Sequence, residues 1–520
     1  MPSPPNEKRT EDSNPQKSSK KLIRGSSFML LGRVIAILVN LAVQVIIVRC
    51  LAKSDYGAFA YGLSIASMGS SIAVFGLGKT FNRFVPIFHE EGKLKEMAGT
   101  IVLTFATVLT LGTAIVLGII GLQSIWVQRF ATNPFSVSML VILIFLAPIQ
   151  AIENLLEKMF AIFADPKALF VRRYVVGPGL KLAAALPLLF LHKNARWLAY
   201  TYVAAGLLGV VYSVVLLFKV MKRKQLMQHF RLSEIKVPAR KIYGFSMPLV
   251  ITDLLPAVRS AFVPILLEFF HGTLAVAAFR SVLPIARLNQ TANESFKLLF
   301  TPTVSRLYAR DDRAGIELAF WKNSAWIAVI TFPLFAVCSL FAEQICVLVL
   351  GDSYASSASV LSILAVGFYA LAVGGLATHV MRAFGLVKLI FLIDASCVCL
   401  ALFLSAAFIP NHGAVGGATA VAISVLAGTC LNIFTLFRQR IVTKTPPAFV
   451  GLVAIAAGLL AASFGMSRII PESLWWRPLL LVISLFLVFW SSIRFLDING
   501  TFPEVERLLA KRGLKWAAKK

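Results

Sequence analysis

The sequence predicts an all-α polytopic membrane protein with about 14 transmembrane helices. The chain has 520 residues, of which 58% are hydrophobic and 14% are charged, and its mean hydropathy is +0.80. A soluble domain has about 45–50% apolar and about 25% charged residues. Apolar runs of about 20 residues recur along the chain, and a helix of this length crosses about 30 Å of hydrocarbon. Backbone in lipid must make all its hydrogen bonds internally, and the runs are too long for barrel strands, so we expect helices.

The apolar runs form two groups of six and a final pair, and a basic stretch at 221–241 separates the groups. The expected spans are 26–48, 57–78, 97–121, 136–158, 174–192, 198–219, 242–268, 274–296, 317–340, 358–381, 387–409, 413–437, 448–467 and 477–495. We therefore expect a disordered basic cytoplasmic tail (1–25), an N-lobe (26–220), a basic cytoplasmic linker (221–241) and a C-lobe (242–437). Helices thirteen and fourteen (448–495) and a basic cytoplasmic tail (496–520) complete the chain.

The positive charge follows the expected membrane topology. The formal net charge is +27, and most Lys and Arg residues fall in alternate loops, on the side that would hold both termini. The positive-inside rule places such loops in the cytoplasm. This asymmetry accounts for most of the charge without nucleic acid, so we expect no nucleic-acid partner. The expected location is a bacterial inner (plasma) membrane, with both termini cytoplasmic.

A weak internal repeat relates the two halves. The second span runs from 56–63 into the basic segment 79–93, and the eighth runs from 274–281 into 297–312. Each segment has a Lys near an aromatic residue, then a Phe/Pro/Arg pattern and a charged loop. Because each half has an even number of spans, the halves would be parallel repeats about an axis along the membrane normal. We expect two six-helix lobes around a central cavity.

Several spans carry charges at depths that need an explanation, because a charge in hydrocarbon costs about 2.5–3.5 kcal/mol on insertion scales. Arg280, Arg287 and Glu294 are spaced by seven residues, so they would stack on one face of the eighth helix. Gln290 and Asn293 lie on or beside that face. The first span carries a similar stripe, and the seventh carries two charges around a proline. These residues are Arg33, Asn40 and Gln44, and Asp253, Pro256 and Arg259.

Two interpretations of the buried arginines remain open. Each arginine could pair with an acid between helices, and Glu294, Asp253, Glu153, Glu157 and Asp394 are candidates. Alternatively, arginines from both halves could converge on a wet, cationic central cavity. Planar guanidinium groups about two turns apart suit a phosphate or diphosphate.

Motifs for other functions are absent. The segment GLGKT at 76–80 resembles the end of a phosphate-binding loop, but that motif needs glycine where Ala73 stands and a strand before it. The six cysteines have neither disulfide nor zinc spacing. We find no credible Ser/His/Asp set or metal cluster. We therefore expect no enzyme activity, no cofactor and no metal.

Residues 27–86 resemble the opening of Wzx-type polysaccharide flippases. An L-x-x-x-x-YG turn at 51–57 follows the first helix, and the second ends in a GLG…RF segment (76–78 and 83–84). The Gly-rich HGAVGGATAVAIS at 412–424 resembles the start of that family's twelfth helix. The resemblance covers about 26–440 and indicates the multidrug/oligosaccharidyl-lipid/polysaccharide (MOP) exporter superfamily. It implies two lobes that work by alternating access.

The resemblance implies a flippase that moves a polyprenyl-diphosphate-linked oligosaccharide to the periplasmic leaflet, for O-antigen or exopolysaccharide. Its partners would be this glycan lipid, membrane lipids and possible polysaccharide assembly proteins. Cationic residues on the first, second and eighth helices match Arg33, Arg83, Arg280 and Arg287, and Arg259 is added from its depth. Expected polar cavity residues are Asn40, Gln44, Ser64, Ser67, Ser71, Gln290 and Asn293, and candidates for ion coupling are Glu294 and Asp253.

Two other functions would be distinguished by charge and loop length. A cation- or proton-coupled drug antiporter of the same superfamily would need an acidic cavity, whereas here deep basic residues outnumber the acids on the same faces. A membrane glycosyltransferase or polymerase would need a catalytic acid or base in a large loop, whereas the external loops here are short.

Overall fold

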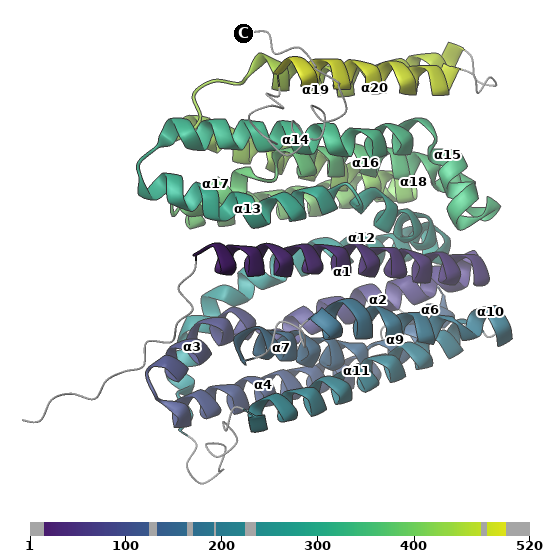
Figure 1. Ribbon diagram of the computed structural model, residues 1–520. Coiled ribbons are helices and arrows are strands. Elements are labelled where there is room, and N and C mark those ends of the chain that lie inside the picture. Colours follow the sequence, from purple (N-terminus) through teal and green to yellow (C-terminus); the bar gives the residue numbers. More distant parts are fainter. Residues whose placement is uncertain are drawn as a thin grey trace, which may run out of the picture.

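The computed structural model describes residues 15–123, 133–163, 170–191, 194–223, 236–469 and 476–495. In this part of the chain the secondary structure is helical, without strands (Figure 1). Ten segments are long and apolar enough to cross a membrane. Two of them, 239–309 and 387–438, are long enough to cross twice, and each contains one non-helical glycine, Gly272 or Gly413. With two shorter apolar helices near the end, the described segments account for the 14 expected crossings, and the all-α polytopic fold is confirmed.

The helices of the first half are α1 (Pro15–Cys50), α2 (Lys53–Val74), α3 (Leu77–Glu90), α4 (Leu94–Gly121), α6 (Pro134–Leu143), α7 (Leu146–Phe163), the π-helix η1 (Val171–Val176), α9 (Gly177–Ala185), α10 (Pro187–Leu191) and α11 (Ala195–Arg223). Those of the second half are α12 (Ala239–Arg287), α13 (Gln290–Ala309), α14 (Arg313–Leu340), α15 (Ala342–Ile345), η4 (Cys346–Leu350), η5 (Asp352–Ser357), α16 (Ala358–Gly374), α17 (Ala377–Ala383), α18 (Val387–Arg438), α19 (Pro447–Ile469) and α20 (Trp476–Phe495).

The helices form two bundles, and α19 and α20 lie against α14 on the outside of the second (Figure 1). Helix α1 runs between the bundles. It begins at Pro15 rather than near residue 26, since the segment 15–25 holds several Ser, Lys and Leu residues compatible with a helix. Residues 1–14, most of the linker (224–235) and the C-terminal tail (496–520) lie outside the described residues, so the expectations for them stay predictions.

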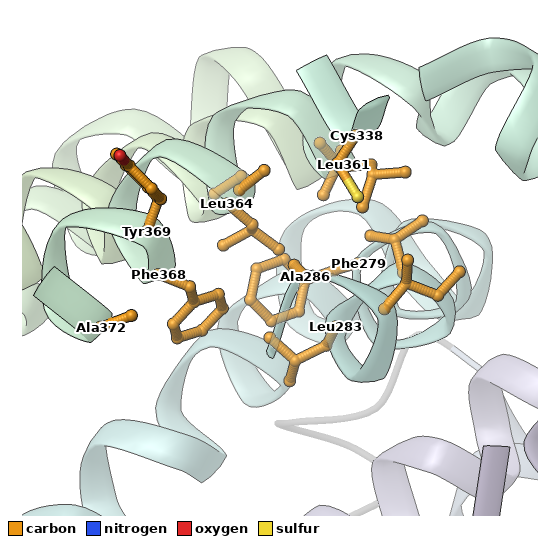
Figure 2. Close-up of a cluster of buried hydrophobic side chains, with 14 of the residues drawn as sticks. Phe279, Leu283, Ala286, Cys338, Leu361, Leu364, Phe368, Tyr369 and Ala372 are labelled. Carbon is orange, nitrogen blue, oxygen red and sulfur yellow. The ribbon is translucent and has the colours of Figure 1, made fainter. Parts of the chain in front are cut away.

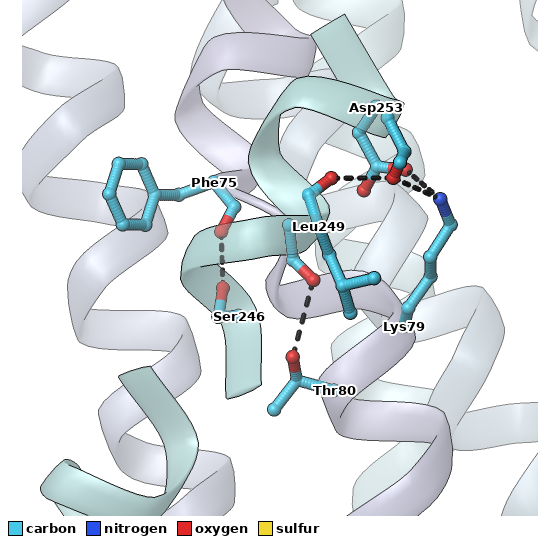
Figure 3. Close-up of polar contacts among 8 residues, drawn as sticks. Phe75, Lys79, Thr80, Ser246, Leu249 and Asp253 are labelled. Carbon is cyan, nitrogen blue, oxygen red and sulfur yellow. Dashed lines mark hydrogen bonds and ion pairs between the residues drawn. The ribbon is translucent and has the colours of Figure 1, made fainter. Parts of the chain in front are cut away.

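Several expected spans are distorted, and two of the distortions lie at related places in the two halves. The second span breaks between α2 and α3 at Phe75 and Gly76. The eighth keeps helical φ and ψ at Leu288 and Asn289, between α12 and α13, but its hydrogen bonds there are tighter, from Leu288 N–H to the Ile285 carbonyl and from Thr291 N–H to the Leu288 carbonyl. Both Phe75 and Gly76 have positive φ, 49° and 67°. Ser246 donates to the freed Phe75 carbonyl at 2.5 Å, and a β-carbon on Gly76 would lie 2.8 Å from the Ser246 carbonyl oxygen (Figure 3). A glycine therefore allows α12 to pack tightly against the break.

Contacts between the two bundles occur near both ends of the helices. At one end, here called the Gly272 end, Lys53 donates to the carbonyl oxygen of Ser353 at 2.8 Å and Arg49 to that of Val349 at 3.0 Å. At the other end, here called the Glu91 end, the side chains of Thr107 and Tyr243 hydrogen-bond at 2.6 Å. The two halves of the chain are thus hydrogen-bonded to each other toward both ends of the helices.

Candidate functional site

The second half of α12, from 273 to 287, has one face in the hydrophobic core. Phe279, Leu283 and Ala286 are buried and lie toward α16, and Leu364 and Phe368 of α16 are part of the same cluster (Figure 2). Residues spaced three and four apart share a helix face. Arg280 and Arg287 lie about a quarter turn around the helix from that face. The core packing thus fixes the direction of both arginines.

Arg259, Arg280 and Arg287 form what we call the arginine cluster. The guanidinium group of Arg287 interacts electrostatically with those of both Arg280 and Arg259. It also lies 5.7 Å from the centre of the Phe368 ring, a cation–π contact. Arg280 is half-buried and interacts electrostatically with Tyr56 of α2, whose hydroxyl accepts a hydrogen bond from Gln44 of α1 at 2.5 Å. The arginine cluster therefore includes residues from both halves of α12, and Arg280 connects it to Tyr56 in the first bundle.

Carboxylates do not neutralise the arginine cluster at close range. Among the described residues, the ion pairs involve none of the three arginines. Asp394 of α18 interacts electrostatically with Arg259 and Arg382. These three residues, with Lys79, line a cavity of about 560 Å³ between α3, α12 and α18. Arg280, which is half-buried, and Arg287, which is exposed, therefore carry positive charge that is not paired with a close carboxylate among the described residues.

Arg33 has a different environment from the cluster. Its Nη2 atom lies 3.6 Å from Oε2 of Glu294, and Lys297 forms an ion pair with the same oxygen. The side chains of Arg33 and Glu294 are 27% and 41% exposed, so the pair is in contact with solvent. It links α1 to α13. Arg33 matches the interpretation in which an arginine is paired with an acid.

The segment that carries Arg280, Arg287 and Glu294 has a local distortion between Arg287 and Gln290. Leu288 and Asn289 keep helical φ and ψ, but Leu288 N–H donates to the Ile285 carbonyl, and Pro284 has no N–H to donate. Glu294 lies beyond this distortion, in α13, and pairs with Arg33.

Asp253 forms an ion pair that sequence reasoning missed. Lys79 Nζ of α3 lies 2.7 Å from Asp253 Oδ1 and donates to Thr252 Oγ1, also at 2.7 Å (Figure 3). Lys158 of α7 interacts electrostatically with Asp253 as well. Two lysines of the first bundle thus hold one carboxylate of α12. Lys79 belongs to the GLGKT segment, and its position in that segment, at the end of the expected second span, was the signal available in the sequence.

Arg83 lies apart from these charges, over aromatic rings. Its guanidinium carbon is 4.5 Å from the centre of the Phe245 ring and 5.6 Å from that of Phe84. The side chain is exposed. The contact joins α3 to the first turns of α12, near the Glu91 end.

The expected polar cavity residues separate into three environments. Asn293 donates to the carbonyl oxygen of Ala372 at 2.7 Å, and Gln290 is half-buried near it in sequence. Ser64 is 3% exposed and donates to the Ala60 carbonyl within its own helix. Ser71 also bonds within its helix, to the carbonyl oxygen of Ser67.

Asn40 and Ser67 line a polar cavity of about 430 Å³ inside the first bundle. Its wall includes Glu153, Glu157, Arg172, Arg173 and Lys181. Arg172 is 5% exposed, pairs with Glu153, and donates from Nε to Ser213 at 2.5 Å. Arg172 precedes the expected fifth span and was not identified from the sequence. In the structure it belongs to η1 inside the bundle.

The described part of the chain shows no candidate site for metal or thiol chemistry. Its His, Cys, Asp and Glu residues form no group of three able to hold a metal ion. The six cysteines are free, and none of them lies in the arginine cluster.

Solved structures with similar folds are transporters. The lipid II flippase MurJ in an inward closed conformation superposes with a TM-score of 0.62 and 11% identity, over 92% of this chain and 99% of the other. An inward-facing multidrug resistance MATE family transporter of the MOP superfamily superposes with a TM-score of 0.60 and 17% identity, over 78% and 94%. These likenesses show the fold. Comparison with curated protein sequences gives no match.

A protein-family comparison gives the family directly. The model described as polysaccharide biosynthesis protein matches residues 46–359, which is more than half of the chain. This match includes the YG and GLG…RF segments, and the fold is that of MOP transporters, so the expected resemblance is confirmed. The chain belongs to the polysaccharide biosynthesis protein family, a group with the MOP transporter fold.

Proposed function

We propose that this protein is a flippase that moves a polyprenyl-diphosphate-linked oligosaccharide from the cytoplasmic to the periplasmic leaflet of a bacterial inner membrane. The glycan would be destined for O-antigen or exopolysaccharide. The orientation follows the positive-inside rule, which assigns the Glu91 end to the cytoplasm and the Gly272 end to the periplasm. In this proposal the protein acts by alternating access and catalyses no covalent chemistry.

The observation that carries the proposal is the arginine cluster without close carboxylates. Arg287 lies in electrostatic range of both Arg280 and Arg259, so these like charges repel one another, while Arg259 and Arg287 keep exposed surface that an anion can reach. An anion of matching size relieves this repulsion. A diphosphate offers several acceptor oxygens to forked N–H donors, which makes charge-assisted hydrogen bonds with more than one arginine possible.

The remaining expected residues receive roles that follow their positions. Arg33 and Arg83, toward the Glu91 end, would meet the diphosphate first, and Arg33 would exchange Glu294 for phosphate. Arg287, Arg280 and Arg259 would then hold it further along α12. Asn40 and Ser67, in the cavity of the first bundle, are positioned to hydrogen-bond sugar hydroxyls. The polyprenyl tail would stay in lipid between the lobes.

Alternating access requires the contacts at the two ends to break in turn. The Lys79–Asp253 and Arg33–Glu294 pairs would open to admit substrate, and the Lys53 and Arg49 contacts would open to release it. Movement of negative charge outward follows an inside-negative potential, and each charge gains about 2.3 kcal/mol per 100 mV. Glu294 and Asp253, each held by cations, are the candidates to take up a proton during the return step.

The charge of the cluster argues against a drug antiporter, the alternative within the same fold. Cationic drugs would be repelled by Arg280 and Arg287, which lack close carboxylates among the described residues. A glycosyltransferase or polymerase would need a catalytic acid or base held in a loop, and the described turns at Gly272 and Gly413 are single residues.

Binding of undecaprenyl diphosphate to the purified, full-length protein tests the proposal. We expect Arg287→Glu and the double variant Arg280→Gln with Arg287→Gln to weaken binding by at least tenfold, about 1.4 kcal/mol, with undecaprenyl alcohol as the uncharged reference. Arg310→Gln, in an exposed turn, is the control. In cells, Arg287→Glu should stop glycan export at normal protein abundance. Normal binding and export by this variant would exclude Arg287 from the mechanism.

A further inference from the structure

A second pocket, mostly apolar with a few charged and polar side chains, lies on the flank of the C-lobe, outside the proposed substrate path. It has a volume of about 630 Å³ and lies between α14, α15 and α16 on one side and α20 on the other. Helices α19 and α20 lie as a pair along α14 (Figure 1). The pocket is near the Gly272 end, because Ser339 and Glu343 in its wall flank the end of α14.

Two hydrogen-bond donors of this pocket lack acceptors in the described part of the protein. The indole N–H of Trp476 is buried without a partner, and the Trp476 residue is only 8% exposed. The hydroxyl of Ser339 is buried without a partner as well. Buried polar groups in native proteins are nearly always hydrogen-bonded. Both residues line the pocket, but these two donor atoms are closed off from it in this structure, so the charged side chains of its wall are the groups that an occupant can reach.

The pocket also holds one positive and one negative side chain that do not pair with each other. Arg477 and Glu343 both line it, and the described ion pairs include neither residue. Arg477 lies 5.5 Å from the centre of the Trp476 ring and donates one weak hydrogen bond, to Gln344 Oε1 at 3.4 Å. Most of its N–H donors remain available. Separate opposite charges in one pocket suit a zwitterion.

The surroundings of the pocket indicate that this zwitterion comes from lipid. The outward side of α20 exposes large apolar residues, among them Leu479, Val482 and Phe486. In a membrane protein such a surface contacts acyl chains. Tryptophan and arginine at the end of a spanning helix lie at the level of lipid headgroups.

We propose that this pocket binds an aminophospholipid such as phosphatidylethanolamine. The phosphodiester accepts hydrogen bonds from Arg477, and the ammonium group pairs with Glu343. The acyl chains lie along α20. The bound lipid joins α20 to α14 and α15, and so holds the final helix pair against the C-lobe. This site is independent of the flippase proposal, because the arginine cluster takes no part in it.

Lipid retention by the intact protein, measured by native mass spectrometry, tests the proposal. The full chain in detergent is offered dioleoyl phosphatidylethanolamine or dioleoyl phosphatidylglycerol at equal concentrations. We expect preferential retention of phosphatidylethanolamine by the unchanged protein and at least a fivefold loss in Arg477→Gln. Glu343→Gln should abolish the preference between the two lipids, since it removes the partner of the ammonium group. Arg310→Gln and Asp311→Asn, in an exposed turn, are charge-matched controls.

Three results would overturn the proposal. The first is equal retention of both lipids by the unchanged protein. The second is unchanged retention by folded Arg477→Gln; if that variant does not fold, Arg477→Met serves instead, since it keeps an unbranched side chain and removes the charge. The third is displacement of the lipid by an equal concentration of phosphoethanolamine, which would indicate a soluble ligand.

Discussion

Gly57 of α2 lies directly against the backbone of Thr273 in α12. A β-carbon built on Gly57 would overlap the Thr273 carbonyl oxygen. This is the glycine of the YG pair, and it lies one residue after Tyr56, whose ring meets that of Tyr354 edge to face at 6.4 Å. The motif thus has a physical role, because it allows the two bundles to approach closely at the Gly272 end.

Gly57→Ala should therefore separate the bundles at this end. Overpacking of a tight contact costs about 1–3 kcal/mol, and backbone atoms cannot move aside as a flexible side chain can. We expect a lower melting temperature of the detergent-purified protein and weaker cross-linking of a cysteine pair placed at Lys53 and Ser356. Gly118→Ala is the matched control, since its β-carbon would meet nothing within 4 Å. Equal effects of the two variants would contradict this role.

Breaking the Lys79–Asp253 pair should open the Glu91 end with little loss of stability. The side chains are 52% and 24% exposed, and ion pairs in contact with water contribute about 0.2–1 kcal/mol. Asp253→Asn should speed maleimide labelling of Thr107→Cys by up to about fivefold, in a background without the native cysteines.

The charge swap Lys79→Asp with Asp253→Lys tests whether this change depends on the pair itself. We expect the swap to restore slow labelling at least in part, although Lys158 then faces a like charge. Asp311→Asn, in an exposed turn, is the control for loss of a carboxylate. Fast labelling in both Asp253→Asn and Asp311→Asn would show that the effect is not specific to the Lys79–Asp253 pair.

Breaking the buried Arg172–Glu153 pair should lower the stability of the protein more than breaking the Lys79–Asp253 pair. Removal of one partner from a buried ion pair costs about 3–5 kcal/mol, because the other charge is left uncompensated. We expect Arg172→Met to lower the melting temperature markedly, and the double variant with Glu153→Gln to recover most of the loss. Lys181→Met is the control, since Lys181 lines the same cavity and forms none of the described ion pairs. Additive losses in the double variant would contradict a direct coupling.

Arg287→Lys should separate charge from geometry in the cluster. Lysine keeps the positive charge but lacks the planar fork that contacts two oxygens together. We expect binding of undecaprenyl diphosphate to fall between that of the unchanged protein and that of Arg287→Gln, with less discrimination against undecaprenyl monophosphate. Binding by Arg287→Lys equal to that of the unchanged protein would show that charge alone matters there.

The sequence predicted the helices and the helix face shared by Arg280 and Arg287, because both depend on residues that are close together in the chain. Arg280 and Arg287 share a face because a helix repeats every 3.6 residues, and Phe279, Leu283 and Ala286 show which face is buried. The sequence does not indicate in this way which residues on different helices contact each other. Lys79 was known only as a basic residue at the end of a span, and its contact with Asp253 depends on how α3 meets α12.

Helix interruptions were also hard to predict. The break at Phe75 is stabilised by Ser246, which is 171 positions away in the chain, so no local pattern announces it. The Arg33–Glu294 pair joins α1 to α13, and the spacing of charges within one span does not indicate it. Arg172 was placed outside the bilayer because the apolar run begins after it, whereas the π-helix η1 carries it into the bundle.

The single-residue joint at Gly272 has a mechanical consequence. Arg259 stands before it and Arg280 and Arg287 after it, with no slack chain between the two arms. A change of φ and ψ at this glycine alters the angle between the arms while their joined ends stay together. The separation of Arg259 from the other two arginines would then follow that angle, so the same tilt that opens the transporter would also loosen its hold on the anion.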